Sequence, residues 1–140
     1  MVQFDAINLH IETERLLLRP FLLSDAEKVT YYCNDKMLNK SVANLPFPYT
    51  LDHALTWIDR QNTENYPFFD FAIVDKNTDE LIGSISLSNR INQRVGELGY
   101  WIGRAHWHKG YATEASKAMI QFAFNNQNYH KVYARHFLSN

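Results

Sequence analysis

The chain has 140 residues, 46% hydrophobic and 21% charged, which fits one compact globular domain and no disordered or fibrous class. Fourteen basic and fifteen acidic residues give a net charge of -1, which lacks the positive field needed by a nucleic-acid-binding protein. Cys33 is the only cysteine, and neither a signal peptide nor an apolar run of ~18 residues is evident, which predicts a reducing cytoplasm and no membrane partner.

The first half of the chain predicts a strand, a helix, a loop and a second helix, at residues 15–21, 24–34, 44–49 and 51–62. The apolar run RLLLRPF stops at Pro20, which indicates a strand near a sheet edge. Ser24 and Glu27 have the spacing of a capping box, which predicts the start of the first helix. Pro46 and Pro48 remove backbone donors, so the segment between the two helices is expected to be a loop.

The second half predicts three strands, a helix and a last strand, at residues 69–74, 81–87, 95–102, 111–127 and 131–138. Apolar residues alternate with period two in the first strand, and polar stretches at 76–80 and 89–94 are typical of turns. Apolar positions recur at helical spacing after Tyr111. The order of elements predicts an α/β fold with a mixed sheet covered by helices.

The segment with most chemical information joins a strand to a helix through HKGYAT, residues 108–113. The first backbone amides of a helix have no intrahelical partner and lie at the positive end of its dipole, so they favour a phosphate. Lys109 would add a mobile charge, and Gly110 permits a positive φ or a close approach to a ligand. The alternative is an ordinary strand-to-helix turn, which these residues alone favour.

Residues from about 14 to 140 resemble the ribosomal-protein N-terminal acetyltransferase branch of the Gcn5-related N-acetyltransferase family. The resemblance rests on TERLLLRPF, LPFPYTLDHALTWI, WHKGYATEASKAMIQFAF and KVYARHFLSN, and above all on ELGYWIG followed by KGYATEA. In the phosphate loop, Ala105 replaces the family's usual Gln or Arg, and His108 replaces its first glycine. The resemblance implies an acyl-CoA N-acyltransferase fold, a mostly antiparallel sheet with helices on both faces. It also implies a single domain, residues 1–140, that lacks the family's C-terminal helix and strands.

The resemblance implies that acetyl-CoA is the co-substrate. Its pantetheine arm would lie between the strands ending near Ile102 and starting near Lys131 and pair with backbone of residues 101–103, and its pyrophosphate would lie over residues 109–113. The expected cofactor-binding residues are Trp101, Ile102, Gly103, Arg104, His108, Lys109, Gly110, Tyr111, Ala112, Thr113 and Asn140. His106 and His108 could ligate a metal, but no further ligand motif is near them, so no metal is expected.

The resemblance implies transfer of the acetyl group to a primary amine, either a protein N-terminus or a small molecule, by direct attack in a ternary complex. Glu97 is the candidate base; alternatively it is an exposed strand carboxylate or a partner of Arg94. A backbone amide near residues 101–103 would bind the carbonyl oxygen. Phe47, Tyr49 and Tyr100 are candidates for acceptor binding, or else fill the core.

Two alternatives stay open from the sequence. One is a module that holds coenzyme A without turnover, and the other is an incomplete fragment whose fold depends on a partner. The last strand would expose apolar residues along an edge, at Val132, Tyr133, Phe137 and Leu138. A homodimer covering that edge is therefore a candidate assembly.

Overall fold

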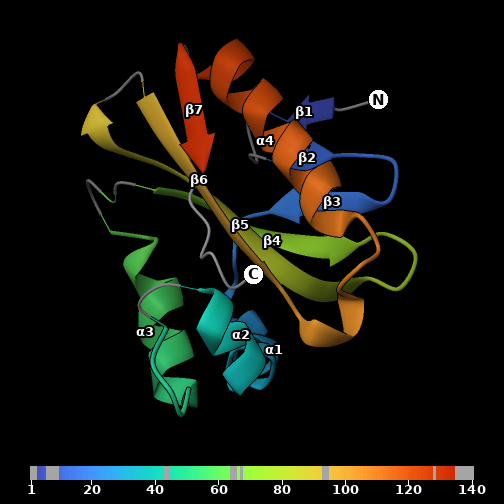
Figure 1. The fold of residues 1–140 in the computed structure, drawn as a ribbon, viewed down its shortest axis with the longest axis vertical. Helices are drawn as coiled ribbons and strands as arrows, with labels where there is room; N and C mark the ends of the chain where they lie inside the picture. The colour runs from blue at the N-terminus through green and yellow to red at the C-terminus, as the bar shows by residue number, and fades with distance from the viewer. Residues whose placement is uncertain are drawn as a thin grey trace.

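The fold is given by a computed structural model, which describes residues 3–5, 10–42, 45–63, 66, 68–92, 95–127 and 129–134 (Figure 1). The structure describes seven strands in one sheet, and their order in the sheet is their order in the chain. Their bounds are β1 Gln3–Asp5, β2 His10–Glu12, β3 Leu16–Arg19, β4 Phe68–Asp75, β5 Glu80–Asn92, β6 Val95–Ile102 and β7 Lys131–Ala134. All neighbours are antiparallel except β6 and β7, which are parallel. The predicted mixed, mostly antiparallel sheet is confirmed.

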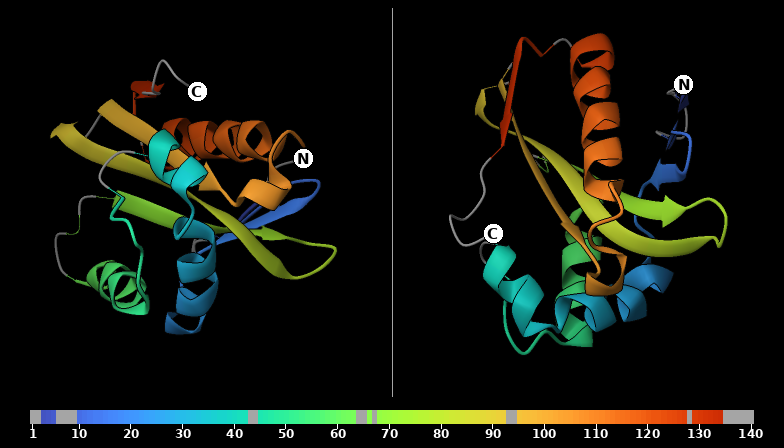
Figure 2. Two further views of the ribbon diagram at one scale, coloured as in Figure 1. Left: turned by 60° about the horizontal axis from the view of Figure 1, so that its bottom comes forward. Right: turned by 45° about the vertical axis from the view of Figure 1, so that its right-hand side comes forward.

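Helices cover both faces of this sheet (Figure 2). One face carries α1 Ala26–Cys33, α2 Lys36–Ser41 and α3 Leu51–Arg60, and the other carries α4 Tyr111–Asn126. Two short 3-10 turns, η1 Leu23–Asp25 and η2 Arg104–His106, precede α1 and α4. The β6–α4–β7 unit is the crossover that makes its two strands parallel. Among the described residues, no helix has the length and apolar character needed to cross a membrane.

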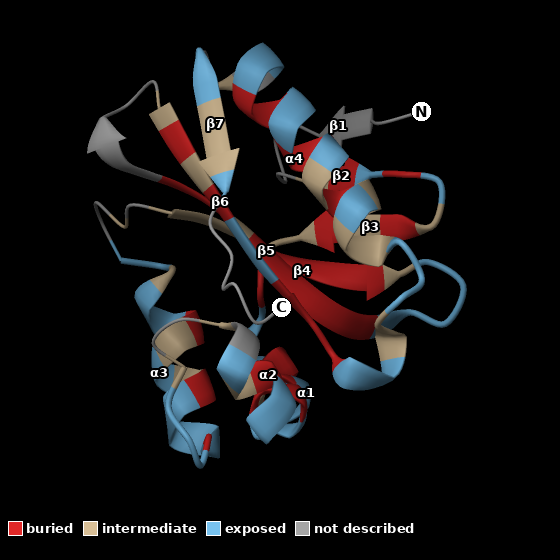
Figure 3. Cartoon of the chain, in the orientation of Figure 1, coloured by how far each residue is buried: buried red, intermediate tan, exposed pale blue. Residues whose placement is uncertain are grey.

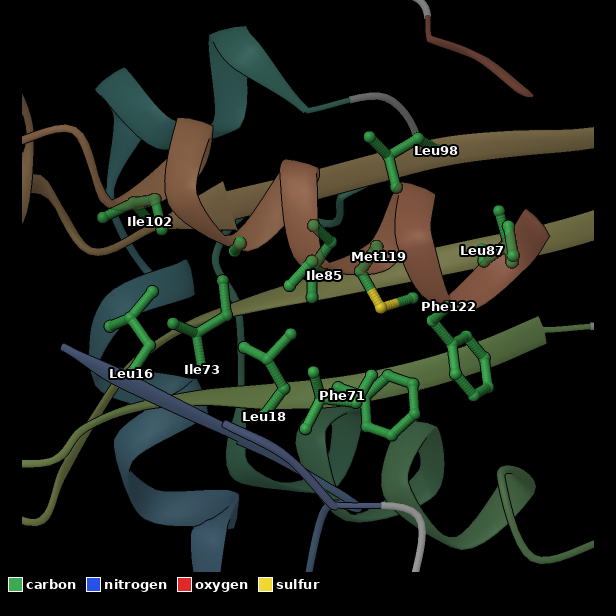
Figure 4. Close-up of a cluster of buried hydrophobic side chains, with 14 of the residues drawn as sticks. Leu16, Leu18, Phe71, Ile73, Ile85, Leu87, Leu98, Ile102, Met119 and Phe122 are labelled. Atoms are coloured by element: carbon green, nitrogen blue, oxygen red, sulfur yellow. The ribbon is translucent and has the colours of Figure 1, made fainter. Parts of the chain in front are cut away.

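The two faces of the sheet bury two separate hydrophobic clusters, and Figure 3 colours the buried residues of the strands and helices red. The α4 cluster joins side chains of β3 to β6 to the inner face of α4, including Leu18, Phe71, Ile85, Met119 and Phe122 (Figure 4). The second cluster packs the opposite face of the strands against α1 to α3. Alternate residues of β4 enter alternate clusters, as the period of two predicts.

The N-terminal region differs from the prediction in three respects. The strand predicted near a sheet edge is β3, which lies third in the sheet, because β1 and β2 extend the sheet beyond it and β4 pairs with its other side. The predicted capping box of Ser24 and Glu27 is wrong: the Asp25 carboxylate accepts the Leu22 N–H at 2.8 Å instead. Helix α2 was not predicted; it begins after Asp35, whose side chain accepts the Met37 N–H at 2.9 Å.

Later elements follow the prediction more closely. Helix α3 begins where expected, because Thr50 and His53 cap each other's backbone amides. Strand β6 has the predicted bounds, and α4 ends one residue early. The polar turn predicted from residue 89 begins later, because β5 continues to Asn92, and residues 93 and 94 lie outside the described residues. The last strand is described as far as Ala134, so its predicted positions 135–138 also lie outside.

Candidate functional site

The segment between β6 and α4 has two residues in the left-handed conformation. His108 has a φ of 64° and Gly110 a φ of 80°. Gly110 caps α4, and the first helical hydrogen bond runs from the Glu114 N–H to the Gly110 carbonyl, at 3.0 Å. Glycine reaches this conformation without steric cost, whereas a histidine resists it. His108 therefore keeps the backbone shape of a glycine at the position where the sequence departs from the family pattern.

The N-terminus of α4 supplies the expected anion-binding geometry. Tyr111, Ala112 and Thr113 form its first turn, so their backbone amides have no partner within the helix and lie at the positive end of its dipole. Lys109 is exposed one residue before the cap. The structure thus brings the predicted residues 108–113 together in one turn with backbone donors and a cation, exposed except for the half-buried Tyr111 and Ala112.

The backbone of β6 points its hydrogen-bonding groups alternately toward β5 and away from it. The Gly103 N–H donates to the Ile82 carbonyl at 2.8 Å, so the backbone N–H of Gly103 points toward β5. Trp101, two residues earlier and opposite Ser84, points its backbone N–H the same way. The intervening Ile102 therefore faces away from β5. Its carbonyl accepts the Trp107 indole N–H at 2.6 Å, which leaves its amide as the outward donor. Of residues 101–103, which were predicted to pair with the pantetheine arm, Ile102 is therefore the one whose backbone N–H points outward.

The outer edge of β6 is paired with another strand along its first half only. Its first four residues, Val95 to Leu98, pair with β7, and the described ladder ends at the pair of Leu98 and Ala134. From Gly99 to Ile102, β6 is paired with β5 and with no second strand among the described residues. This edge runs directly into the loop before α4, which is the arrangement expected for an extended ligand that ends in a phosphate.

A polar network anchors the start of α4 to the beginning of β3. Glu114 accepts hydrogen bonds from the Thr13 hydroxyl, the Arg15 N–H at 2.9 Å and the Arg15 Nε at 2.6 Å. Burial raises the pKa of Glu114, but these hydrogen bonds and the Arg15 charge outweigh it, so the pKa is lowered overall. Arg15 also donates from Nη1 to the Lys109 carbonyl at 2.9 Å. The sequence analysis missed this network, because its members lie about a hundred positions apart.

A second set of contacts fixes η2 to α1 and to the start of α2, which cover the sheet face opposite to α4. The Arg104 guanidinium lies 3.1 Å from the Asp35 carboxylate at the start of α2. The Tyr32 hydroxyl lies 3.4 Å from His106 Nε2, and burial together with the Lys109 charge lowers the pKa of His106. Gly103 contacts the Tyr32 ring so closely that a Cβ there would lie 2.4 Å from it. Arg104, predicted to bind the cofactor, is thus held partly by α2.

Glu97, the candidate base, is half-buried in β6 on the face covered by α1 to α3. The register places it directly opposite Ser88 of β5 and Tyr133 of β7, so two hydroxyl side chains flank it across the sheet. Ser84, Ser86 and Ser88 alternate with apolar residues that face α4. This alternation in SISLS was the available sequence signal for a hydroxyl-rich face beside Glu97, and it was not used.

One more ionisable pair lies on that face. The Tyr66 hydroxyl donates to the Asp70 carboxylate, and the register places Asp70 opposite Ser86. Burial raises the pKa of Asp70 to about 6, although the Tyr66 hydrogen bond and the Arg60 charge act in the opposite direction. Asp70 was also missed, because a single aspartate in a strand gives no sequence signal of its burial.

The three predicted acceptor-binding residues do not lie together. Phe47 is exposed in the loop before α3, whereas Tyr49 is buried in the cluster with α1 to α3, which fits the core-filling alternative. Tyr100 is exposed, and by alternation along β6 its side chain lies on the face opposite to that of Glu97. Asn140 lies outside the described residues.

The remaining candidates concern metals and thiols. In the ranges that the structure describes, no group of three or more His, Cys, Asp or Glu side chains could hold a metal ion. Cys33 is buried in α1, and burial raises the pKa of its thiol to about 12. This thiol is therefore protonated at neutral pH and suits packing rather than nucleophilic attack.

Comparisons with known proteins identify the family and the fold. The family model described as "Acetyltransferase (GNAT) domain" matches residues 15–140. An uncharacterized N-acetyltransferase, p20, of Bacillus licheniformis is 35% identical over 127 residues, which cover 88% of this chain and 70% of that protein. Among solved structures, a GNAT-family acetyltransferase from Bacillus anthracis is similar with a TM-score of 0.79 and 25% identity, covering 90% of this chain and 72% of the other.

A second solved structure is that of a ribosomal-protein-S5-alanine acetyltransferase from Vibrio fischeri. It is similar with a TM-score of 0.74 and 26% identity, covering 90% of this chain and 73% of the other. The family model, the curated relative and both structures therefore agree on the family and on the fold. The chain belongs to the GNAT family of acetyltransferases, which transfer an acetyl group from acetyl-CoA.

Proposed function

We propose that this chain transfers the acetyl group of acetyl-CoA to a primary amine, by direct attack of the amine on the thioester in a ternary complex. The observation that carries the proposal is the continuous path from the outer edge of β6 at Gly99–Ile102, through the left-handed residues His108 and Gly110, to the start of α4. An extended pantetheine arm fits the strand edge, and a pyrophosphate fits the helix N-terminus.

The cofactor would be held mainly by backbone groups. The Ile102 amide would donate to the pantetheine or to the thioester carbonyl, because it is the outward donor among residues 101–103. The pyrophosphate would accept from the amides of residues 109–113, with the Lys109 ammonium nearby. Trp101, Gly103, Arg104 and His108 would shape this path, and Asn140 keeps only its sequence-based assignment.

Glu97 would act as the general base in this mechanism. The amine attacks the thioester carbon in its neutral form, so the ammonium form must first lose a proton, which a half-buried carboxylate can accept directly or through water. Ser88 and Tyr133, opposite Glu97 in the neighbouring strands, would orient its carboxylate. The attacking nitrogen then loses its second proton, the tetrahedral intermediate collapses, the carbon–sulfur bond breaks, and coenzyme A leaves as a thiolate that takes up a proton.

The acceptor class is a protein N-terminus or a small amine. Similarity to a ribosomal-protein-S5-alanine acetyltransferase supports the first of these. Phe47 is exposed and would contact an acceptor, while Tyr49 would support the loop from beneath; Tyr100, on the face opposite to that of Glu97, keeps only its sequence-based assignment. We further propose one catalytic domain in the reducing cytoplasm, and a homodimer along β7 as its candidate assembly.

The test is titration calorimetry of acetyl-CoA into the purified chain, followed by a thiol-release assay with amines and N-terminal peptides. We expect saturable binding in the micromolar range, roughly -8 kcal/mol, together with thiol release for at least one amine. Binding without release by any acceptor would favour the coenzyme-holding module, and absence of binding would refute the site. Sedimentation of the same sample tests the homodimer.

A further inference from the structure

Arg15 reaches the proposed phosphate loop from the beginning of β3, with more contacts than a simple ion pair needs. Its Nε lies 2.6 Å from Glu114 Oε1, its Nη1 donates to the Lys109 carbonyl at 2.9 Å, and its guanidinium lies 4.5 Å from the centroid of the Tyr111 ring. Its Nη2 lies 3.4 Å from the position that a Cβ on Gly110 would occupy. One planar group therefore touches the residue before the cap, the cap and the first turn of α4.

The hydrogen bond from Arg15 to the Lys109 carbonyl fixes the orientation of the peptide group between Lys109 and Gly110. In a trans peptide the C=O and the following N–H point in opposite directions. Because the Lys109 carbonyl points toward Arg15, the Gly110 N–H points away from it. Arg15 thereby orients the Gly110 amide toward the side opposite its own side chain.

Glu114 makes the arrangement rigid on the helix side. It accepts from Thr13 and from both the backbone and the side chain of Arg15, so α4 is fixed to the start of β3 by three hydrogen bonds. The Arg15 side chain is 41% exposed, and an ion pair so exposed contributes little to overall stability. Its contacts are better explained by the position they impose on the loop than by the free energy of folding they supply.

We infer that Arg15 is a positioning residue for the coenzyme, which orients the Lys109–Gly110 peptide and the first turn of α4 so that their amides converge on the pyrophosphate. This inference rests on the proposed function, because it assigns the pyrophosphate to that loop. Lysine cannot replace arginine in this role. A single ammonium cannot keep the fork that holds Glu114 and the Lys109 carbonyl at once.

The chain contains a matched control on β3, the strand that begins directly after Arg15. Arg19, near the other end of β3, pairs with Asp25 through two hydrogen bonds of 2.8 and 3.0 Å, and the structure describes no contact of its side chain with the loop. Arg19→Met therefore removes a comparable arginine–carboxylate pair at a distance from the proposed site. Arg15→Met removes the side-chain donors of Arg15 but keeps its backbone N–H bond to Glu114, and Arg15→Lys keeps the side-chain charge.

The experiment measures the Kd for acetyl-CoA by calorimetry and the melting temperature for these three variants and the unmodified chain. We expect about tenfold weaker binding for Arg15→Met and for Arg15→Lys, as for the loss of one charge-assisted hydrogen bond. Arg19→Met should bind within twofold of the unmodified chain even where its melting temperature falls. Binding is measured at a temperature at which all variants are folded. A higher Kd for the Arg15 variants but not for Arg19→Met would then show an effect on the position of the loop and not on stability.

Three outcomes would overturn the inference. Binding by both Arg15 variants within twofold of the unmodified chain would show that the contacts do not position the loop. Full recovery by Arg15→Lys would show that only the charge matters, and equal weakening by Arg19→Met would show a general effect of stability. Failure of the unmodified chain to bind acetyl-CoA would instead refute the proposed function.

Discussion

Replacing Asp70 by asparagine is expected to stabilise the protein at pH 8. Burial raises the pKa of Asp70 from its ordinary value of 3.8 to about 6. The difference of about 2 corresponds to about 3 kcal/mol at 1.36 kcal/mol for each pH unit. Because the side chain is only partly buried and water still reaches it, we expect about 2 kcal/mol. Asparagine keeps an oxygen that can accept the Tyr66 hydroxyl and removes the charge.

The effect should depend on pH with a defined sign. Between pH 4 and 6 the folded protein binds a proton on Asp70 that the unfolded chain has released, so stability falls as the pH rises through this window. Above pH 6 the free-energy cost of the charged Asp70 carboxylate has reached its full value and no longer changes with pH. The advantage of Asp70→Asn should therefore be full at pH 8 and nearly absent at pH 4.

Urea unfolding at pH 4, 6 and 8 measures this advantage. Asp59→Asn is the control, because Asp59 is an exposed carboxylate of α3, and it should change the free energy of unfolding by less than about 0.5 kcal/mol at any pH. An Asp70→Asn variant that is less stable at pH 8, or whose advantage is equal at pH 4 and pH 8, would refute the reasoning.

Three further substitutions test other parts of the structure. His108→Gly should relieve about 1 kcal/mol of left-handed backbone cost and raise the melting temperature by about 3 °C without weakening acetyl-CoA binding; a lower melting temperature would contradict this. Gly103→Ala should cost about 1–3 kcal/mol, because its Cβ would lie 2.4 Å from the buried Tyr32 ring. Gly99→Ala is its control, with the nearest atom at 3.3 Å, and an equal loss in chemical denaturation would count against the packing argument. Glu97→Gln should lower kcat by about 10²- to 10⁴-fold with an unchanged Kd for acetyl-CoA; thiol release within twofold of the unmodified rate would remove Glu97 from the mechanism.

Strong periodicity explains which elements could be predicted. Strand β4 alternates apolar residues between two clusters, and α4 repeats them at helical spacing, so both were identified from the sequence. Strands β1 and β2 have three residues each, which is too short to show a period. Helix α2 has six residues, and its start signal, Asp35, is not followed by apolar residues at helical spacing.

The candidate site was visible in the sequence where its residues are contiguous and not where they are far apart. The segment from His108 to Thr113 could be read as an anion-binding turn, because strand, glycine and helix follow one another directly. The Arg15–Glu114 pair spans 99 positions, and no local pattern joins them. Which amide of β6 faces outward depends on the register with β5, and that register exists only in the folded sheet.

The order of the strands has a consequence for how the chain assembles. Strands β4, β5 and β6 are neighbours both in sequence and in the sheet, so their hairpins join residues that are close along the chain. Strand β7 reaches β6 only through the α4 crossover, and the Arg15–Glu114 pair closes a loop of 99 residues. Contacts of such separation carry a larger entropic cost and form late. We therefore expect the coenzyme site to be completed by the last contacts to form, so that a partly folded chain cannot bind acetyl-CoA and coenzyme binding marks the end of folding.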